Sequence, residues 1–170
     1  MILLGNIVAF SGCIIMVLIG FVKEKKKILL LQCVQSAFMG TGNLLLGGMS
    51  GFISNGVSIV RNLMLLKYEN TPVLKIGFIA IQILLTVWTG DGSMIQWLPV
   101  IATVIFVCCF DLKNVVVFKS VLTIGQSLWL IYDLCYYNYV AAAFDIMTLI
   151  STVIGIRMLL KENKQKHRSV

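Results

Sequence analysis

Residues 2–22 read ILLGNIVAFSGCIIMVLIGFV, and the charged cluster KEKKK follows at residues 23–27. A helix needs roughly 20 apolar residues to cross the hydrocarbon core of a bilayer. The run therefore predicts a transmembrane helix that ends at a basic boundary. Because no basic segment precedes the run, we expect it to remain in the mature protein and not to be a cleaved signal peptide.

Six further apolar runs follow the first. They cover residues 28–47, 51–67, 73–89, 94–110, 114–135 and 139–160. Their hydrophobicity is continuous, whereas the strands of a membrane barrel alternate apolar and polar residues. The chain is 59% hydrophobic and 12% charged, against about one half and one quarter in soluble domains. These features predict an all-α membrane protein with seven transmembrane helices.

The basic residues occupy alternate breaks between the runs. Of the 14 Lys and Arg residues, 13 lie in breaks that would face one side of the membrane, and Arg61 lies within the third run. The positive-inside rule then predicts an outer N-terminus and a cytoplasmic C-terminus. A nucleic-acid partner is not expected despite the net charge of +7, because such binding concentrates basic residues on a soluble face.

An internal repeat with a shift of 90 residues connects the two halves of the chain. Asn43 and Asn55 are twelve residues apart, and so are Asp133 and Asp145. A repeat of three helices in the same orientation needs a linker helix, which predicts a 3+1+3 layout. The predicted units are a first three-helix bundle at residues 1–70, linker helix four at 71–92, a second bundle at 93–162 and a cytoplasmic tail at 163–170.

Polar side chains in the apolar runs form the candidate solute-binding site. An Asp at the centre of a membrane helix costs roughly 2.5–3.5 kcal/mol on insertion scales, so such residues mark candidate substrate or ion pathways. The alternative is hydrogen bonding between helices. The predicted substrate-binding residues are Asn43, Asn55, Ser58, Asn62, Gln126, Trp129, Asp133, Asp145 and Thr148.

Geometry and residue type suggest roles for several members of this set. The members of each Asn or Asp pair lie about six residues from a short turn, so they can face one another across a helical hairpin. Trp129 could stack on a planar solute, or it could face lipid or pack in the core. Arg61 is a candidate inner gate; the alternative is that it snorkels to the interface.

No catalytic or metal-binding set is predicted. The single histidine, His167, lies in the charged tail, and the five cysteines lack the spacing of a zinc or redox motif. No Ser-His-Asp arrangement is present in the apolar runs. We therefore expect a protein that is not an enzyme and that needs neither a metal nor another cofactor.

Four short motifs carry a resemblance to a known family. They are NGVSIVRN at residues 55–62, WTG at 88–90, LPVIAT at 98–103 and LWLIYD at 128–133. In order and spacing the chain resembles the YgjV family of small bacterial inner-membrane proteins. This resemblance implies a multi-pass protein of the bacterial cytoplasmic membrane.

That family is more distantly similar to the PQ-loop group, which includes the SWEET sugar transporters and the Pnu-type vitamin transporters. The resemblance implies two parallel three-helix bundles joined by a linker helix. SWEET proteins hold sugar with an Asn pair on helices three and seven, and the counterparts here are Asn55 and Asp145. The acidic residue disfavours a neutral sugar, and the Pro-Gln dipeptide of the group is absent from this sequence.

Two functions follow as hypotheses. The first is a facilitator or proton-coupled transporter of a small polar solute, such as a vitamin, sugar, nucleoside or amine, by alternating access of the two bundles. The expected partners are that solute and the lipid bilayer, with the protein as a monomer or small homo-oligomer. The alternative is a non-transporting receptor or accessory protein, since KDEL-type receptors share the PQ-loop architecture.

Overall fold

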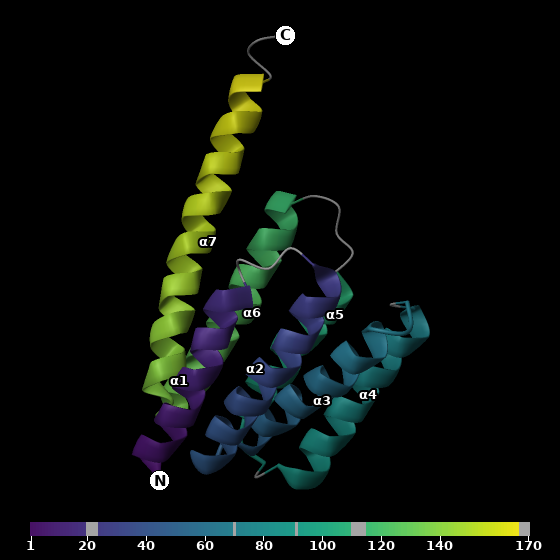
Figure 1. The fold of residues 1–170 in the computed structure, drawn as a ribbon, viewed down its shortest axis with the longest axis vertical. Helices are drawn as coiled ribbons and strands as arrows, with labels where there is room; N and C mark the ends of the chain where they lie inside the picture. The colour runs from purple at the N-terminus through teal and green to yellow at the C-terminus, as the bar shows by residue number, and fades with distance from the viewer. Residues whose placement is uncertain (20–23, 70, 91, 110–114, 167–170) are drawn as a thin grey trace.

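The computed structural model of the chain describes all residues except 20–23, 70, 91, 110–114 and 167–170. The described residues form seven α-helices and no strand (Figure 1). The helices are α1 (Ile2–Ile19), α2 (Lys25–Leu45), α3 (Met49–Leu65), α4 (Pro72–Thr89), α5 (Trp97–Cys109), α6 (Val115–Cys135) and α7 (Tyr139–Lys166). The prediction of an all-helical chain with seven helices is confirmed.

The observed helix boundaries differ from the predicted ones by a few residues. Helix α2 begins at Lys25, inside the basic cluster, and α7 continues to Lys166 instead of ending at residue 160. Lys and Glu are good helix formers, so a helix can run past the end of its apolar segment. Residues 163–166 of the predicted tail are thus helical, and its remainder, with His167, lies outside the described residues.

Four of the helices are long and apolar enough to cross a membrane. They are α1, residues 26–45 of α2, α4 and residues 139–158 of α7, and α5 is a shorter apolar helix. Large apolar side chains also cover the outside of the fold: on α4, Leu84 is 68% exposed and Trp88 is 83% exposed. Such a surface suits a hydrocarbon solvent.

Six of the helices form a closed ring. Helix α2 lies between α1 and α3 and contacts both, and α6 likewise contacts both α5 and α7. The contacts α1–α7 and α3–α5 close the circle. Helix α4 lies outside the ring and contacts only α3 and α5 within the described part of the chain. In Figure 1 the N-terminus and the α2–α3 and α6–α7 turns lie at the lower end, and the C-terminus lies at the upper end.

Small residues allow the closest helix pair to form. A Cβ atom added to Gly42 on α2 would lie 3.1 Å from the backbone oxygen of Gly5 and 3.2 Å from the Cβ of Ala9, both on α1. Small residues at membrane helix interfaces permit this kind of backbone approach. The α1–α2 contact therefore depends on the absence of a side chain at position 42.

Candidate solute-binding site

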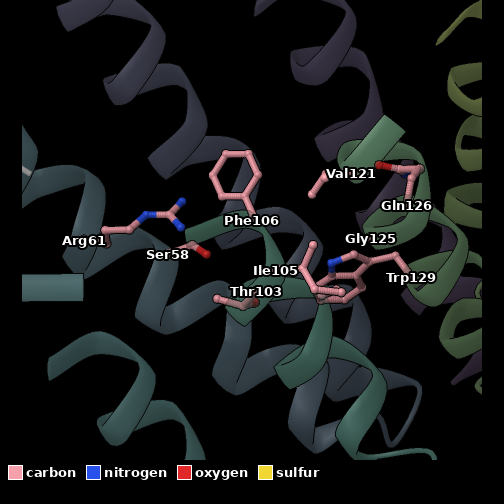
Figure 2. Close-up of a pocket in the computed structure, with 10 residues that line it drawn as sticks. Ser58, Arg61, Thr103, Ile105, Phe106, Val121, Gly125, Gln126 and Trp129 are labelled. Carbon is pink, nitrogen blue, oxygen red and sulfur yellow. The ribbon is translucent and has the colours of Figure 1, made fainter. Parts of the chain in front are cut away.

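A cavity of about 210 Å³ lies between α3, α5 and α6. Figure 2 shows that Arg61 and Trp129 enter it from opposite sides of the view. Its walls come from both sets of three consecutive helices, so it lies where the two halves of the chain meet. The lining residues are Ser58, Arg61, Ala102, Thr103, Ile105, Phe106, Val121, Gly125, Gln126 and Trp129.

Helical spacing places the polar lining residues on common faces. Ser58 and Arg61 are three residues apart on α3, and Gln126 and Trp129 are three apart on α6, so each pair shares a face. Gly125 is buried, and a Cβ added to it would meet only the backbone oxygen of Ala102, at 3.8 Å. The small residue therefore leaves space between α5 and α6 beside the cavity.

Arg61 supplies the charge of the cavity. Its guanidinium lies 5.4 Å from the centroid of the Phe106 ring, within the range of a cation–π interaction. Its Nε and Nη2 each donate to the Oδ1 of Asn62 at 3.4 Å, and Asn62 in turn donates to Gln32 at 3.4 Å. Among the described residues no carboxylate forms an ion pair with Arg61, so a ring face and one amide oxygen are its partners.

A pair of buried carboxyl groups lies behind the α6 wall of the cavity. Asp133 is 1% exposed and Asp145 is 6% exposed. Gln126 donates from Nε2 to Oδ1 of Asp145, and the Oδ2 of Asp145 is buried with no hydrogen-bond partner among the described residues. The carboxyl groups of Asp133 and Asp145 are close enough to interact electrostatically. An ionised carboxylate can only accept hydrogen bonds, so a direct hydrogen bond between the two groups would require a proton on one of them.

Two asparagines extend this chain of contacts to the N-terminal end of the fold. Asn138, which is fully buried, donates from Nδ2 to Oδ1 of Asp133 and to Oδ1 of Asn43, both at 3.1 Å. Polar contacts therefore run from Asn43 through Asn138 and the carboxyl pair to Gln126 in the cavity wall. We refer to these five residues, Asn43, Gln126, Asp133, Asn138 and Asp145, as the polar chain.

Tyr132 spans the ring of helices at the same end. Its side chain is completely buried, and its hydroxyl accepts a hydrogen bond from the backbone N–H of Gly51 on α3 at 2.7 Å. The hydroxyl of Ser50 lies 3.3 Å away. Because α3 and α6 are not neighbours in the ring, this side chain connects its two halves and closes the space between them.

Replacing Tyr132 with Phe is expected to destabilise the protein by about 1–3 kcal/mol. The change leaves the buried N–H of Gly51 without its acceptor, and an unsatisfied buried donor carries a cost of that order. Thermal unfolding of the detergent-purified protein measures the effect. The matched control is Tyr68→Phe, at a position that is 62% exposed. Equal melting temperatures for the two variants would contradict the bridging role of Tyr132.

The turns beside the polar chain share the same backbone geometry at a spacing of 90 residues. The N–H of Gly48 donates to the oxygen of Asn43 at 2.7 Å, and the N–H of Asn138 donates to the oxygen of Asp133 at 2.8 Å. The residue before each donor has a positive φ, 86° at Gly47 and 59° at Tyr137. Helices α2 and α6 also begin and end at positions that differ by 90.

The other predicted site residues lie elsewhere. Asn55 donates to the backbone oxygen of Gly51 at 2.9 Å, and Thr148 donates to that of Phe144 at 2.9 Å, so each bonds within its own helix. Neither these two nor Asn62 belong to the cavity lining. The structure thus places Ser58, Arg61, Gln126 and Trp129 at the cavity, and Asn43, Asp133 and Asp145 with Gln126 in the polar chain.

Several residues of the site were not predicted from the sequence. Thr103 and Phe106 line the cavity from α5, and Gln82 on α4 donates to Ser54 on α3 and, at 3.4 Å, to Thr103. Gln82 is a polar residue within an apolar run, which is a usable signal. Asn138 could also have been found from the sequence, because it lies 90 residues after Gly48 and so occupies the equivalent position in the repeat. Nothing in the sequence marks Phe106 as a site residue, because it is an apolar residue among apolar residues.

Comparison with known protein families identifies a family model that covers most of the chain. The sequence model of the family Imp-YgjV, described as bacterial inner membrane protein, matches residues 3–163. A search of curated proteins and a search of solved structures find no match.

Proposed function

The chain belongs to this YgjV family of bacterial inner membrane proteins, and we propose that it carries a small polar solute across that membrane by alternating access. As a family member with several long apolar helices, it is a multi-pass protein of the bacterial inner membrane. The observation that carries the proposal is the cavity between the two sets of three helices, joined by Gln126 to a buried carboxyl pair.

The proposed topology has seven transmembrane helices, with the N-terminus outside and the C-terminus in the cytoplasm. The lower end of Figure 1, with the N-terminus and the turns after α2 and α6, would be the outer end. Thirteen of the 14 basic residues would then lie at the cytoplasmic end. The matching turns and helix bounds support a 3+1+3 repeat, in which α4 is the linker.

In this proposal the structure corresponds to a state that is closed at the outer end. Tyr132 and Asn138 connect the two halves of the ring there, through Gly51 and Asn43. Arg61 lies near the cytoplasmic end of α3, so the cavity sits on the inner side of this closure. Rocking one three-helix bundle against the other would break the contacts of Tyr132 and open the cavity to the outside.

Proton coupling follows from the carboxyl pair. A proton carried by the buried pair Asp133 and Asp145 would be one contact away from the cavity through Gln126. Solute binding that moves Gln126 would change the environment of that proton, which is how a carrier links solute movement to proton movement. The proposal contains no catalytic step and no cofactor, and one chain supplies the whole pathway, whether the protein is a monomer or a small homo-oligomer.

A stabilisation panel followed by transport tests this function. The detergent-purified protein is heated with vitamins, nucleosides, sugars, polyamines and small carboxylates, and a solute that binds the folded state raises its stability by about 2.7 kcal/mol at a hundredfold excess over Kd. We expect a stabilising solute to show counterflow, the exchange of labelled for unlabelled solute, in proteoliposomes. Trp129→Phe should weaken the stabilisation, and Trp88→Phe, at an 83% exposed position, should not.

The receptor alternative predicts a different result from the same samples. A solute that stabilises the protein and is not exchanged by proteoliposomes would identify a binding protein without transport. That outcome would overturn the proposed function while leaving the cavity as the binding site.

A further inference from the structure

The charge and shape of the cavity point to one class of solute. We infer that, if the proposed transport function holds, the cavity takes a small organic carboxylate, with its charged group on Arg61 and Ser58 and its body against Trp129. This narrows the solute from polar compounds in general to monoanions. It also excludes the amines among the candidates.

The first argument is the sign of the charge at the wall. Among the described residues that line the cavity, Arg61 is the one ionisable residue, and Asp133 and Asp145 lie behind Gln126 instead of belonging to the lining. A cationic solute would meet the guanidinium with no carboxylate at the wall. A carboxylate would find a cation there, with the hydroxyl of Ser58 one helical turn away on the same face.

The second argument is the unused hydrogen-bonding capacity of Arg61. A guanidinium has five N–H donors in a planar fork that fits a carboxylate with two parallel hydrogen bonds. In the part of the chain that the structure describes, its hydrogen bonds are two long ones to the same amide oxygen of Asn62. Its contact with Phe106 is made by the guanidinium carbon over the ring, 5.4 Å from the centroid, and uses none of the N–H donors in a conventional hydrogen bond.

The third argument concerns the body of the solute. Opposite Arg61, the indole of Trp129 provides a flat apolar wall, and Ile105 lies beside it (Figure 2). The cavity volume of about 210 Å³ is below the roughly 300–1,000 Å³ of pockets for drug-sized ligands. A single ring with one carboxylate has the size and the polarity of this space.

The carboxyl pair gives this class of solute a physical advantage. The inside-negative membrane potential opposes the entry of a monoanion that crosses the membrane alone. A monoanion that moves with one proton is electroneutral and avoids this opposition. A proton carried by the buried pair Asp133 and Asp145, which Gln126 connects to the cavity wall, would therefore complement the cation at Arg61 in one anion–proton site.

Three ligands of the same shape test the inference. Benzoate, benzamide and benzamidine carry a negative, a neutral and a positive group on one ring. Binding of radiolabelled benzoate to the full-length protein in detergent is measured by scintillation proximity, with the other two as competitors. We expect benzoate to bind at least tenfold more tightly than benzamide, and benzamidine not to compete.

Variants assign the binding to Arg61. Arg61→Gln should reduce benzoate affinity at least tenfold, to the level of benzamide, and leave benzamide binding unchanged; benzamide binding also shows that the variant is folded. Arg157→Gln, at an exposed position on α7, is the matched control and should bind benzoate normally. Equal affinities for benzoate and benzamide in the unmodified protein, or an unchanged affinity in Arg61→Gln, would overturn the inference.

This test is separate from that of the proposed function, because binding in detergent requires no transport. Benzoate binding that depends on Arg61, without counterflow of any panel solute, would support the anion site and overturn transport. Counterflow of a nucleoside or an amine, with no benzoate binding, would support transport and overturn the anion site.

Discussion

Replacing Asp145 with Asn is expected to abolish proton-driven accumulation of the solute while leaving its counterflow intact. The Asn side chain can still accept the hydrogen bond from Gln126, so the cavity wall keeps its geometry. The proton that we propose the pair carries is lost, because an amide in place of one carboxyl group removes the buried carboxyl pair. Counterflow moves no net protons, so it needs only a working cavity and the rocking motion.

The measurement uses proteoliposomes with an imposed pH gradient and the solute identified by the stabilisation panel. With one proton per solute molecule, a tenfold proton gradient can sustain accumulation of up to about tenfold, since equal free energies correspond to equal ratios. The unmodified protein should approach this ratio, and Asp145→Asn should equilibrate the solute at a ratio of one.

The matched control is Glu24→Gln, the same acid-to-amide change at an exposed position, where Glu24 pairs with Lys27 at 2.9 Å. This variant should accumulate the solute normally. Normal accumulation by Asp145→Asn would remove the carboxyl pair from the coupling mechanism. If Asp145→Asn lost both counterflow and accumulation, the result would instead place Asp145 in solute binding.

The helices could be predicted from sequence because their signals are local. An apolar run of sufficient length and a basic or glycine-rich break each act within a few residues of where they occur. The boundaries were less exact, because a helix does not end where hydrophobicity ends. Helix α7 continues through Lys-rich sequence to Lys166, and α5 starts at Trp97, three residues later than predicted, after a turn.

The candidate residues could be predicted because a polar side chain in an apolar run is expensive, but the predicted pairing across a hairpin fits only one of the two pairs. Asn43 with Asn55 and Asp133 with Asp145 have the same spacing. The two carboxyl groups are close enough to interact electrostatically, whereas Asn55 bonds to the backbone of its own helix. Asn43 instead meets Asn138, 95 residues away. Which partner a buried amide finds depends on how the helices pack, and spacing along one hairpin does not determine it.

Close packing at the end of the fold that holds the N-terminus leads to the second large effect. Gly51 lies against Tyr132 and Asn43, so that a Cβ added to it would stand 2.6 Å from Nδ2 of Asn43 and 2.7 Å from Cε1 of Tyr132. Both neighbours are buried and hydrogen-bonded, and neither can move without breaking a contact. Forcing a methyl group into a filled core typically costs about 1–3 kcal/mol.

Gly51→Ala is therefore expected to lower the stability of the detergent-purified protein by about that amount, as measured by thermal unfolding. Gly56→Ala is the matched control on the same helix, where an added Cβ meets nothing within 4 Å; it should be neutral or stabilising by up to about 1 kcal/mol, because Ala favours a helix more than Gly. The two substitutions add the same atoms to α3, so opposite signs would isolate the contacts with Tyr132 and Asn43. If Gly51→Ala were as stable as Gly56→Ala, neither Tyr132 nor Asn43 could lie this close to Gly51, and the contacts between the two halves of the ring at this end would have to be different from those described.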